Sequence, residues 1–330
     1  MARSADTETR FASFVATLGR GPGRSRALTR EEAEDAFGMV LRGEADPHQI
    51  GAFLMLLRFR GEDADEITGL VTAARRHAGL PWTDLAVTLD WPSYGAGRTR
   101  GAPWFLLSAL AMARAGIPVL MHGCNGFTQG IGTEAGVLAL DLRPVASAAE
   151  ARRALRRDRF AYVPLRAMAP TVEGLLGMRR LFGLRSPVNT VARLLNPADA
   201  PCGVDGVFHP PYIDVHLGVA ERMRRPRLVV LKGGGGEVER IPLKPAIASV
   251  WDMHAGRGEL ALPAVTGLAP YSASEDPAAL MAAVWRGDAV PATPLATVWA
   301  TIALGLLAIG RTADPAMAMT DAQAIWAQRH

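Results

Sequence analysis

Two glycine-bearing segments of this sequence have the composition to bind an anion. The first is residues 92–100, Pro-Ser-Tyr-Gly-Ala-Gly-Arg-Thr-Arg, between an apolar run at 85–89 and a helical pattern that opens near residue 103. Glycines let a phosphate approach the backbone, and a helix start favours negative charge. An ordinary exposed strand-to-helix turn could have the same composition, so both interpretations stay open. The candidate phosphate contacts are Ser93, Gly95, Gly97, Arg98 and Arg100.

The second segment is residues 232–237, Lys-Gly-Gly-Gly-Gly-Glu, which follows an apolar run at 227–231. Its backbone N–H groups could surround an anion beside a lysine. The alternative is a tight turn that leads into Glu237. The candidate contacts here are Lys232, Gly234 and Gly235.

Histidine and cysteine side chains near these segments have two interpretations each. His122 and Gly123 end the apolar run at 117–121, where the histidine is as well suited to a ligand contact as to a structural hydrogen bond. His209 and His216 have no thiolate or carboxylate set to complete a metal site, which favours packing. Cys124 has no histidine and acid partners that the sequence can assign, which favours a small buried thiol.

The positive charge is carried almost entirely by arginine, since Lys232 and Lys244 are the lysines of the chain. Arginine presents a fork of donors that suits phosphate, so clustered arginines could follow a nucleic-acid backbone. Solvated helix faces give the same pattern. One cluster spans residues 222–227, and the other contains Arg152, Arg153, Arg156, Arg157 and Arg159.

The composition indicates a globular protein of one or two domains. The chain has 330 residues, of which 49% are hydrophobic and 21% charged, with a net charge of +4. The apolar runs at 104–120 and 296–309 are too short or too charged for a membrane span, and no signal-peptide pattern opens the sequence. Two cysteines are too few for a disulfide framework, which favours a reducing compartment. We therefore expect a cytoplasmic location and, from the short apolar runs, no membrane association.

The first third of the chain has a helical pattern. Thr29 and Glu32 form a capping box before a helix that ends at Gly43, and Asp46 with Pro47 starts a second helix. A third helix is expected over residues 63–77, and residues 1–10 are expected to be frayed.

From residue 85 onward, apolar strand signals alternate with helices, which predicts a mainly parallel sheet covered by helices. The strand signals lie at residues 85–89, 117–121, 160–163, 206–208 and 227–231. A helical insert at 171–195 has the spacing of a bundle helix. We therefore predict an α/β fold with a helical domain at 10–82 and 171–195, which forms the dimer, and an α/β domain at 83–170 and 196–330.

Several segments, in order, carry a family resemblance that spans residues 28 to 270. The sequence resembles anthranilate phosphoribosyltransferase and its fold relatives in glycosyltransferase family 3, which include pyrimidine nucleoside phosphorylases. The resemblance implies a small helical domain beside a larger α/β domain of the nucleoside phosphorylase/phosphoribosyltransferase type. The segments are 49–54 (Gln-Ile-Gly-Ala-Phe-Leu), 58–62 (Arg-Phe-Arg-Gly-Glu), 116–123 (Gly-Ile-Pro-Val-Leu-Met-His-Gly), 194–198 (Leu-Leu-Asn-Pro-Ala) and 234–237 (Gly-Gly-Gly-Glu).

The sequence departs from the family pattern where the donor, phosphoribosyl pyrophosphate, would bind. The family's Gly-Thr-Gly-Gly-Asp loop matches residues 93–97, which keep two glycines, and its hydroxyl-bearing helix start matches Pro-Trp-Phe-Leu at 103–106. The Lys-His-Gly-Asn motif becomes Met-His-Gly-Cys at 121–124. The magnesium-binding Asp-Glu pair becomes Gly236 and Glu237, with Glu239 nearby, whereas Arg179 keeps the arginine that holds the anthranilate carboxylate. The resemblance thus implies a kept scaffold with a degenerate donor site.

Three further segments look more like the divergent YbiB-type branch, whose characterised members are DNA-binding homodimers. They are residues 160–165 (Phe-Ala-Tyr-Val-Pro-Leu), 183–186 (Gly-Leu-Arg-Ser) with Thr190, and 232–237. This similarity implies a homodimer that binds single- or double-stranded nucleic acid with little sequence preference and needs no cofactor.

Two other hypotheses stay open beside nucleic-acid binding. The first is an active pentosyltransferase that uses phosphoribosyl pyrophosphate, a changed acceptor and Mg²⁺ held by Glu237 and Glu239. The second is a small-molecule sensor that keeps the cleft without turnover.

Overall fold

The computed structural model describes residues 5–21, 23–95, 101–126, 128, 130–272 and 274–330. Its N-terminal part is a bundle of helices whose starts follow the expected capping. Thr29, Asp46 and Asp63 each accept a hydrogen bond from the first turn of the next helix, and each has a reciprocal capping-box partner. The helices are α1 (Ala5–Gly19), α2 (Arg30–Leu41), α3 (Pro47–Arg60) and α4 (Ala64–His77).

The expected frayed N-terminus is wrong for residues 5–10, which form the start of α1. Phe11, Phe14 and Leu18 are buried on one face of this helix, and the Phe11 ring lies 5.5 Å from that of Phe53. Their spacing is that of an amphipathic helix, so the apolar face overrides the polar residues that precede it.

The larger part of the chain forms a seven-stranded sheet in the order β3-β2-β1-β4-β5-β6-β7. Strands β1 to β5 are parallel, whereas β6 and β7 add an antiparallel hairpin that the sequence pattern did not predict. The mainly parallel sheet is therefore confirmed. The strands are β1 (Leu89–Ser93), β2 (Val119–Gly123), β3 (Phe160–Pro164), β4 (Cys202–Val207), β5 (Arg227–Lys232), β6 (Ala246–Asp252) and β7 (Gly256–Leu262).

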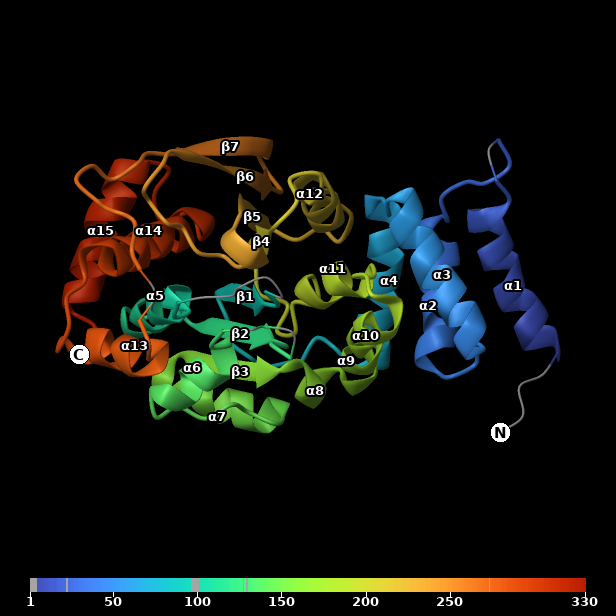
Figure 1. The fold of residues 1–330 in the computed structure, drawn as a ribbon, viewed down its shortest axis with the longest axis horizontal. Coiled ribbons are helices and arrows are strands. Elements are labelled where there is room, and N and C mark those ends of the chain that lie inside the picture. Colours follow the sequence, from blue (N-terminus) through green and yellow to red (C-terminus); the bar gives the residue numbers. More distant parts are fainter. Residues whose placement is uncertain (1–4, 22, 96–100, 127, 129, 273) are drawn as a thin grey trace.

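Helices cover both faces of the sheet, and the N-terminal bundle lies beyond one of these layers, at the right of Figure 1. One layer packs in a core with residues such as Trp91, Met121 and Val229, and it contains α5 (Trp104–Arg114), α6 (Thr133–Ala139), α13 (Pro277–Arg286), α14 (Ala292–Ala308) and α15 (Pro315–Ala327). The opposite face carries α7 (Ala148–Asp158) and α12 (Tyr212–Arg222). No helix in the described part of the chain is long and apolar enough to cross a membrane.

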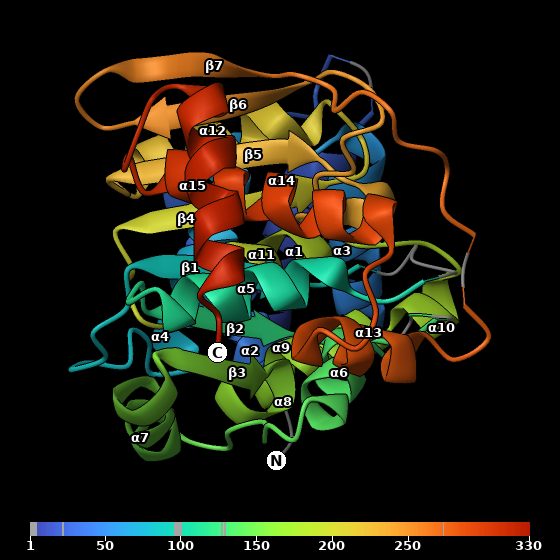
Figure 2. The same ribbon diagram turned by 90° about the vertical axis from the view of Figure 1, so that its left-hand side faces the viewer.

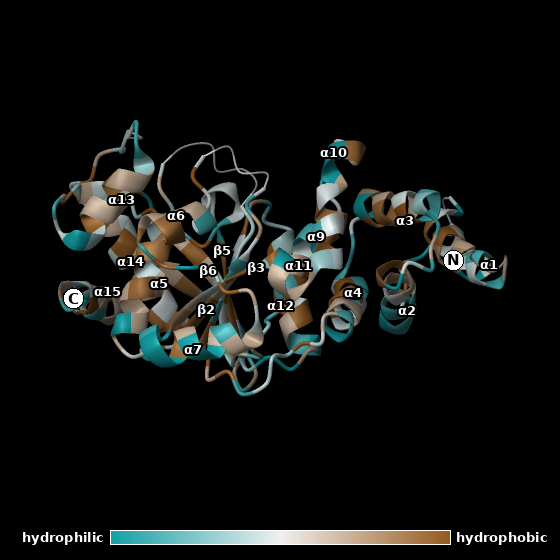
Figure 3. Ribbon diagram, turned by 90° about the horizontal axis from the view of Figure 1, so that it is seen from below, coloured by the Kyte–Doolittle hydropathy of each residue, from teal (hydrophilic) through white to brown (hydrophobic). Residues whose placement is uncertain are grey.

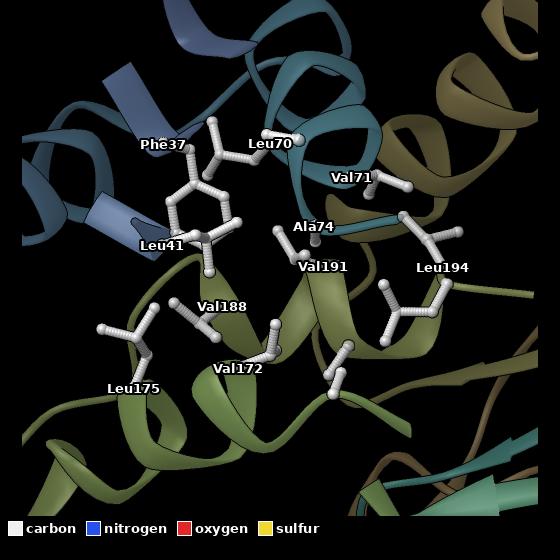
Figure 4. Packing of buried hydrophobic residues seen from close by; sticks show 14 of the residues in the cluster. Phe37, Leu41, Leu70, Val71, Ala74, Val172, Leu175, Val188, Val191 and Leu194 are labelled. Carbon is white, nitrogen blue, oxygen red and sulfur yellow. The ribbon is translucent and has the colours of Figure 1, made fainter. Parts of the chain in front are cut away.

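The segment between β3 and β4 joins the core of the N-terminal bundle (Figure 4). Val188 lies below Phe37 and Leu41, and Val172 belongs to the same buried cluster. This is the packing that a helical unit built from two separate chain segments requires, while the domain limits at 10–82 and 171–195 remain a prediction. The segment's helices are α8 (Leu165–Met168), α9 (Pro170–Gly177), α10 (Arg179–Phe182) and α11 (Val188–Arg193).

Candidate functional site

The sheet opens toward ligands between β1 and β4. The chain leaves β1 toward α5 on one face of the sheet and leaves β4 toward α12 on the other. Such a switch of direction leaves a crevice at the carboxyl ends of the two strands, and ligands of open α/β sheets bind there. Ser93 and Val207 end these strands.

The loop that follows β1 is held by a carboxylate of the same chain. Glu237 Oε1 accepts a hydrogen bond from the Gly95 backbone N–H at 2.5 Å and one from Ser93 Oγ at 3.1 Å. Thr133 Oγ1 lies 2.6 Å from Ser93 Oγ. A Cβ added to Gly95 would collide with the Glu237 carboxylate. The expected anion contacts Ser93 and Gly95 thus bind an internal anion, while Gly97, Arg98 and Arg100 lie outside the described residues.

The two expected metal ligands bind backbone groups of different segments. Glu239 Oε2 accepts a hydrogen bond from the Phe105 N–H in the first turn of α5 at 3.2 Å, whereas Glu237 holds the loop after β1. Among the residues that the structure describes, no three His, Cys, Asp or Glu side chains form a group able to hold a metal ion. In this structure both carboxylates therefore bind backbone groups of their own chain.

The second glycine segment packs as a tight turn, with η1 (Gly234–Gly236) inside it. A Cβ at Gly233 or Gly206 would collide with the Glu237 backbone, and Gly235 has a φ of 67° that favours glycine. These glycines let the turn lie against β4 and place the Glu237 side chain at the loop after β1. Gly234 has open space around its Cα, and Lys232 is exposed at the end of β5.

His122 belongs to a buried polar chain. Its Nδ1 lies 2.7 Å from the Tyr94 hydroxyl, and its Nε2 lies 3.3 Å from Asp90 Oδ1. Asp90 in turn accepts a hydrogen bond from Arg225 at 3.1 Å. The His122 side chain has no exposed surface, so its structural interpretation is the one that the geometry supports. Gly123 is needed because a Cβ there would collide with the Ser93 carbonyl oxygen.

A second cavity, which we call the arginine pocket, lies between the N-terminal bundle and the carboxyl end of β4. Its free volume is about 50 Å³, and it is lined by Arg58 of α3, by Arg185 and Arg193 around α11, and by residues of β4, of α12 and of the loop between them. Arg193 is buried and donates hydrogen bonds of 2.8 Å to the carbonyl oxygens of Tyr94 and Asn189. The pocket and the loop after β1 are therefore neighbours, joined by one guanidinium.

The positive charges of this pocket repel one another. Burial, followed by the charges of Arg193, Arg179 and Arg58, lowers the pKa of Arg185 to about 10. Nε and Nη2 of Arg185 are buried, and no atom in the described part of the structure accepts a hydrogen bond from either. A partly buried guanidinium without an acceptor is costly, and a bound anion would relieve that cost.

Two hydrogen-bonded polar pairs lie at the wall of the pocket. His216 Nδ1 lies 2.7 Å from Asp205 Oδ2, and both side chains are buried. Tyr212 donates a hydrogen bond to Glu62 Oε1 at 2.9 Å and accepts one from Arg58. The second oxygen of each carboxylate, Asp205 Oδ1 and Glu62 Oε2, is buried and accepts no hydrogen bond from Arg185 or from any other described residue.

The structure separates the arginine cluster of α7 from these sites. The cluster's last turn precedes the start of β3, and Arg159 O accepts a hydrogen bond from Val119 N at the start of β2. It therefore lies at the amino edge of the strands, opposite the loop after β1 and the arginine pocket. Figure 2 shows this separation, with α7 at the lower left and α10 at the right. Arg152, Arg153, Arg156 and Arg157 all belong to α7.

Of the other expected contacts, Arg179 at the start of α10 contributes charge to the arginine pocket. The sequence analysis did not single out Arg58, Arg185 or Arg193 as ligand contacts. Their one sequence signal is that Arg58 and Arg185 fall inside the motifs that carry the family resemblance.

Comparison with known proteins agrees with this arrangement. A family model described as the helical bundle domain of a glycosyl transferase family matches residues 13–78. A second, described as the a/b domain of that family, matches residues 105–325. The chain belongs to glycosyltransferase family 3.

Within this family, the chain is similar to enzymes and to a protein without an assigned activity. It is 30% identical to the anthranilate phosphoribosyltransferase of Moorella thermoacetica over 89% of each chain. It is 27% identical to the uncharacterized protein YbiB of Escherichia coli, over 62% of this chain and 64% of that protein.

Solved structures of family members share the fold. Anthranilate phosphoribosyltransferase from Thermus thermophilus superposes with a TM-score of 0.78 at 22% identity, over 97% of this chain and 95% of that one. The Saccharomyces cerevisiae enzyme, in complex with phosphoribosyl pyrophosphate and Mg, gives a TM-score of 0.77 at 17% identity, over 98% and 95%. At these identities the likeness shows the fold alone, which confirms the predicted helical domain beside a larger α/β domain.

Proposed function

We propose that this chain binds nucleic acid through its phosphates, with little sequence preference, and does not transfer phosphoribosyl groups. The arginine pocket carries the proposal, because Arg185 has arginines as its charged neighbours and no acceptor for two of its nitrogens among the described residues. Arginine contacts to phosphate carry no base information, which accounts for low sequence preference.

The loop after β1 supports the second half of the proposal, that the donor site is degenerate. The Glu237 carboxylate already occupies the Gly95 N–H and the Ser93 hydroxyl, so a phosphate would have to displace a negative charge that is held in place. We propose no cofactor for this function.

We also propose a homodimer formed through the helical domain. Phe59 at the end of α3 is 89% exposed, and Leu181 of α10 is 82% exposed. Figure 3 shows α10 projecting beside α3, and the Phe182 ring lies 3.6 Å from the position of a Cβ on Gly51. Exposed apolar side chains on adjacent helices are typical of a self-complementary interface, which a second copy would bury.

The experiment is a titration of labelled single- and double-stranded DNA at several salt concentrations. We expect affinity for single strands to fall with salt by about 0.7 logarithmic units per neutralised phosphate, with little difference between sequences. Absence of DNA binding at low salt would refute the proposal. Light scattering that gives the mass of one chain would refute the dimer.

A second candidate function is phosphoribosyl transfer with Mg²⁺ and a changed acceptor. It is favoured by the 30% identity to an anthranilate phosphoribosyltransferase over 89% of the chain. Calorimetric binding of phosphoribosyl pyrophosphate that depends on Mg²⁺, with release of pyrophosphate, would establish it and replace our first proposal.

A further inference from the structure

We infer that the arginine pocket recognises a phosphomonoester attached to a nucleoside, such as the 5′-phosphate end of a single strand. This inference deepens the proposed nucleic-acid binding and rests on it for the polymer. The pocket could take the same chemical group from a free mononucleotide, and the experiment below separates the two sources.

The charge of the pocket fits a terminal phosphate better than an internal one. Arg58, Arg185 and Arg193 line the cavity, and Arg179 adds its charge to Arg185. A phosphomonoester carries close to two negative charges at neutral pH, whereas a phosphodiester carries one. A dianion therefore neutralises more of this repulsion, and its three terminal oxygens can accept the hydrogen bonds that Nε and Nη2 of Arg185 lack.

The shape of the pocket also fits the end of a strand. Its free volume of about 50 Å³ is room for a few water-sized groups, which suits a phosphate with the nucleoside outside the cavity. Thr190, Arg193 and His216, which line it, are themselves buried, so the inner wall of the cavity consists of buried side chains. The phosphate at the end of a strand can enter such a cavity with the rest of the strand outside.

An aromatic platform lies where the attached base would emerge. Phe208, which lines the pocket, is 51% exposed and is the residue directly after β4. Its ring lies 4.8 Å from that of His209 in an edge-to-face arrangement, so its orientation is supported by a neighbour. Exposed aromatic rings beside cationic grooves stack on unpaired bases of any sequence.

His216 contributes a fixed polar group at the inner end. Asp205 lies against its Nδ1, which orients the ring and leaves Nε2 as the nitrogen that Asp205 does not use. No bond is made or broken in this proposal, since the pocket serves as a binding site.

The experiment compares two short single strands of the same sequence, labelled at the 3′ end, one with a 5′-phosphate and one with a 5′-hydroxyl. We expect the phosphorylated strand to bind about tenfold more tightly, the size of effect that one or two charge-assisted hydrogen bonds produce. Deoxyadenosine monophosphate should compete for the pocket, and inorganic phosphate should compete more weakly because it lacks a base.

Variants locate the effect. Arg185→Met should abolish the preference for the 5′-phosphate, whereas Arg156→Met, which removes the same charge from exposed α7, should keep it. Phe208→Ala changes an exposed side chain and should weaken binding of both strands by about tenfold, the contribution of one stacked base.

Equal affinity for the two strands would overturn this inference and leave the proposed nucleic-acid binding intact. Binding of the mononucleotide without binding of either strand would support a phosphomonoester site in the arginine pocket and refute the proposed binding of nucleic acid. Competition by inorganic phosphate as strong as that by the mononucleotide would overturn the part played by the base.

Discussion

The loop after β1 and the arginine pocket lie side by side at the carboxyl edge of the sheet, and both present donors suited to an anion. In the loop, the Ser93 hydroxyl and the Gly95 N–H are satisfied by Glu237. In the pocket, Arg185 is surrounded by like charges. The loop after β1 thus binds a carboxylate of its own chain, whereas two nitrogens of Arg185 in the arginine pocket have no acceptor among the described residues.

Hydrogen-bond donors alone therefore do not identify a ligand site. What matters is whether these donors already have an acceptor within the protein. A buried donor that already has a partner gains little from a ligand, whereas an unsatisfied one gains the full hydrogen bond. The following changes remove the Glu237 carboxylate, supply a phosphate as an external anion, or remove the Arg185 guanidinium.

Replacing Glu237 by alanine should have the largest effect. The change leaves Ser93 and Gly95 without their acceptor and removes a negative charge that acts on buried Arg193. We expect the free energy of unfolding, measured in urea, to fall by about 3–5 kcal/mol. Glu237→Gln keeps an oxygen acceptor and should cost less.

The same alanine variant would test whether the loop can bind an external anion. Inorganic phosphate should raise the melting temperature of Glu237→Ala more than that of the natural chain. Equal urea midpoints for the variant and the natural chain would contradict the structural role of this carboxylate.

A ligand of the arginine pocket should give the next largest effect. A 5′-phosphorylated strand at a hundredfold excess over its dissociation constant should stabilise the protein by about 2.7 kcal/mol. Phosphoribosyl pyrophosphate with Mg²⁺ should produce no comparable rise in a thermal melt. If phosphoribosyl pyrophosphate with Mg²⁺ raised the melting temperature and the phosphorylated strand did not, the transferase function would be favoured over nucleic-acid binding.

Replacing Arg185 by methionine should stabilise the protein while impairing binding. The folded chain holds this guanidinium's proton less tightly than the unfolded chain does, so the charge destabilises the ligand-free fold at every pH below about 10. We expect the free energy of unfolding at neutral pH to rise by about 1–3 kcal/mol. A loss of stability would show that Arg185 has partners in solution.

Replacing Arg156 by methionine should have the smallest effect. Its side chain is exposed on α7, at the opposite edge of the sheet. We expect DNA affinity to stay within about threefold and the melting temperature to stay unchanged. A larger loss of affinity would place a second phosphate contact surface on α7.

The elements that follow local rules could be predicted from the sequence. Thr29, Asp46 and Asp63 cap their helices because capping depends on residues three positions away. The β6–β7 hairpin was missed because it is an edge with mixed exposure, where Ala248 and Val250 are buried and Ile247 is exposed.

The site could be predicted only in part. Gly95 and Glu237 both fall in recognised glycine segments, but their contact joins residues 142 positions apart. Arg58 and Arg185 meet only when the helical insert returns to the N-terminal bundle. No spacing rule predicts such a meeting. That no described carboxylate accepts a hydrogen bond from Arg185 Nε or Nη2 is likewise a property of packing in three dimensions.

The buried chain from Tyr94 through His122 and Asp90 to Arg225 has a consequence for folding. Strands β1 and β2 are buried along their whole length, and a slip of two residues would keep the same side chains on the same face. In the native register, Pro92 lies opposite His122, which brings Asp90 within reach of the imidazole. In a shifted register, the buried Asp90 carboxylate would lose its contact with His122. These few polar groups therefore select one alignment from several that the apolar residues would tolerate.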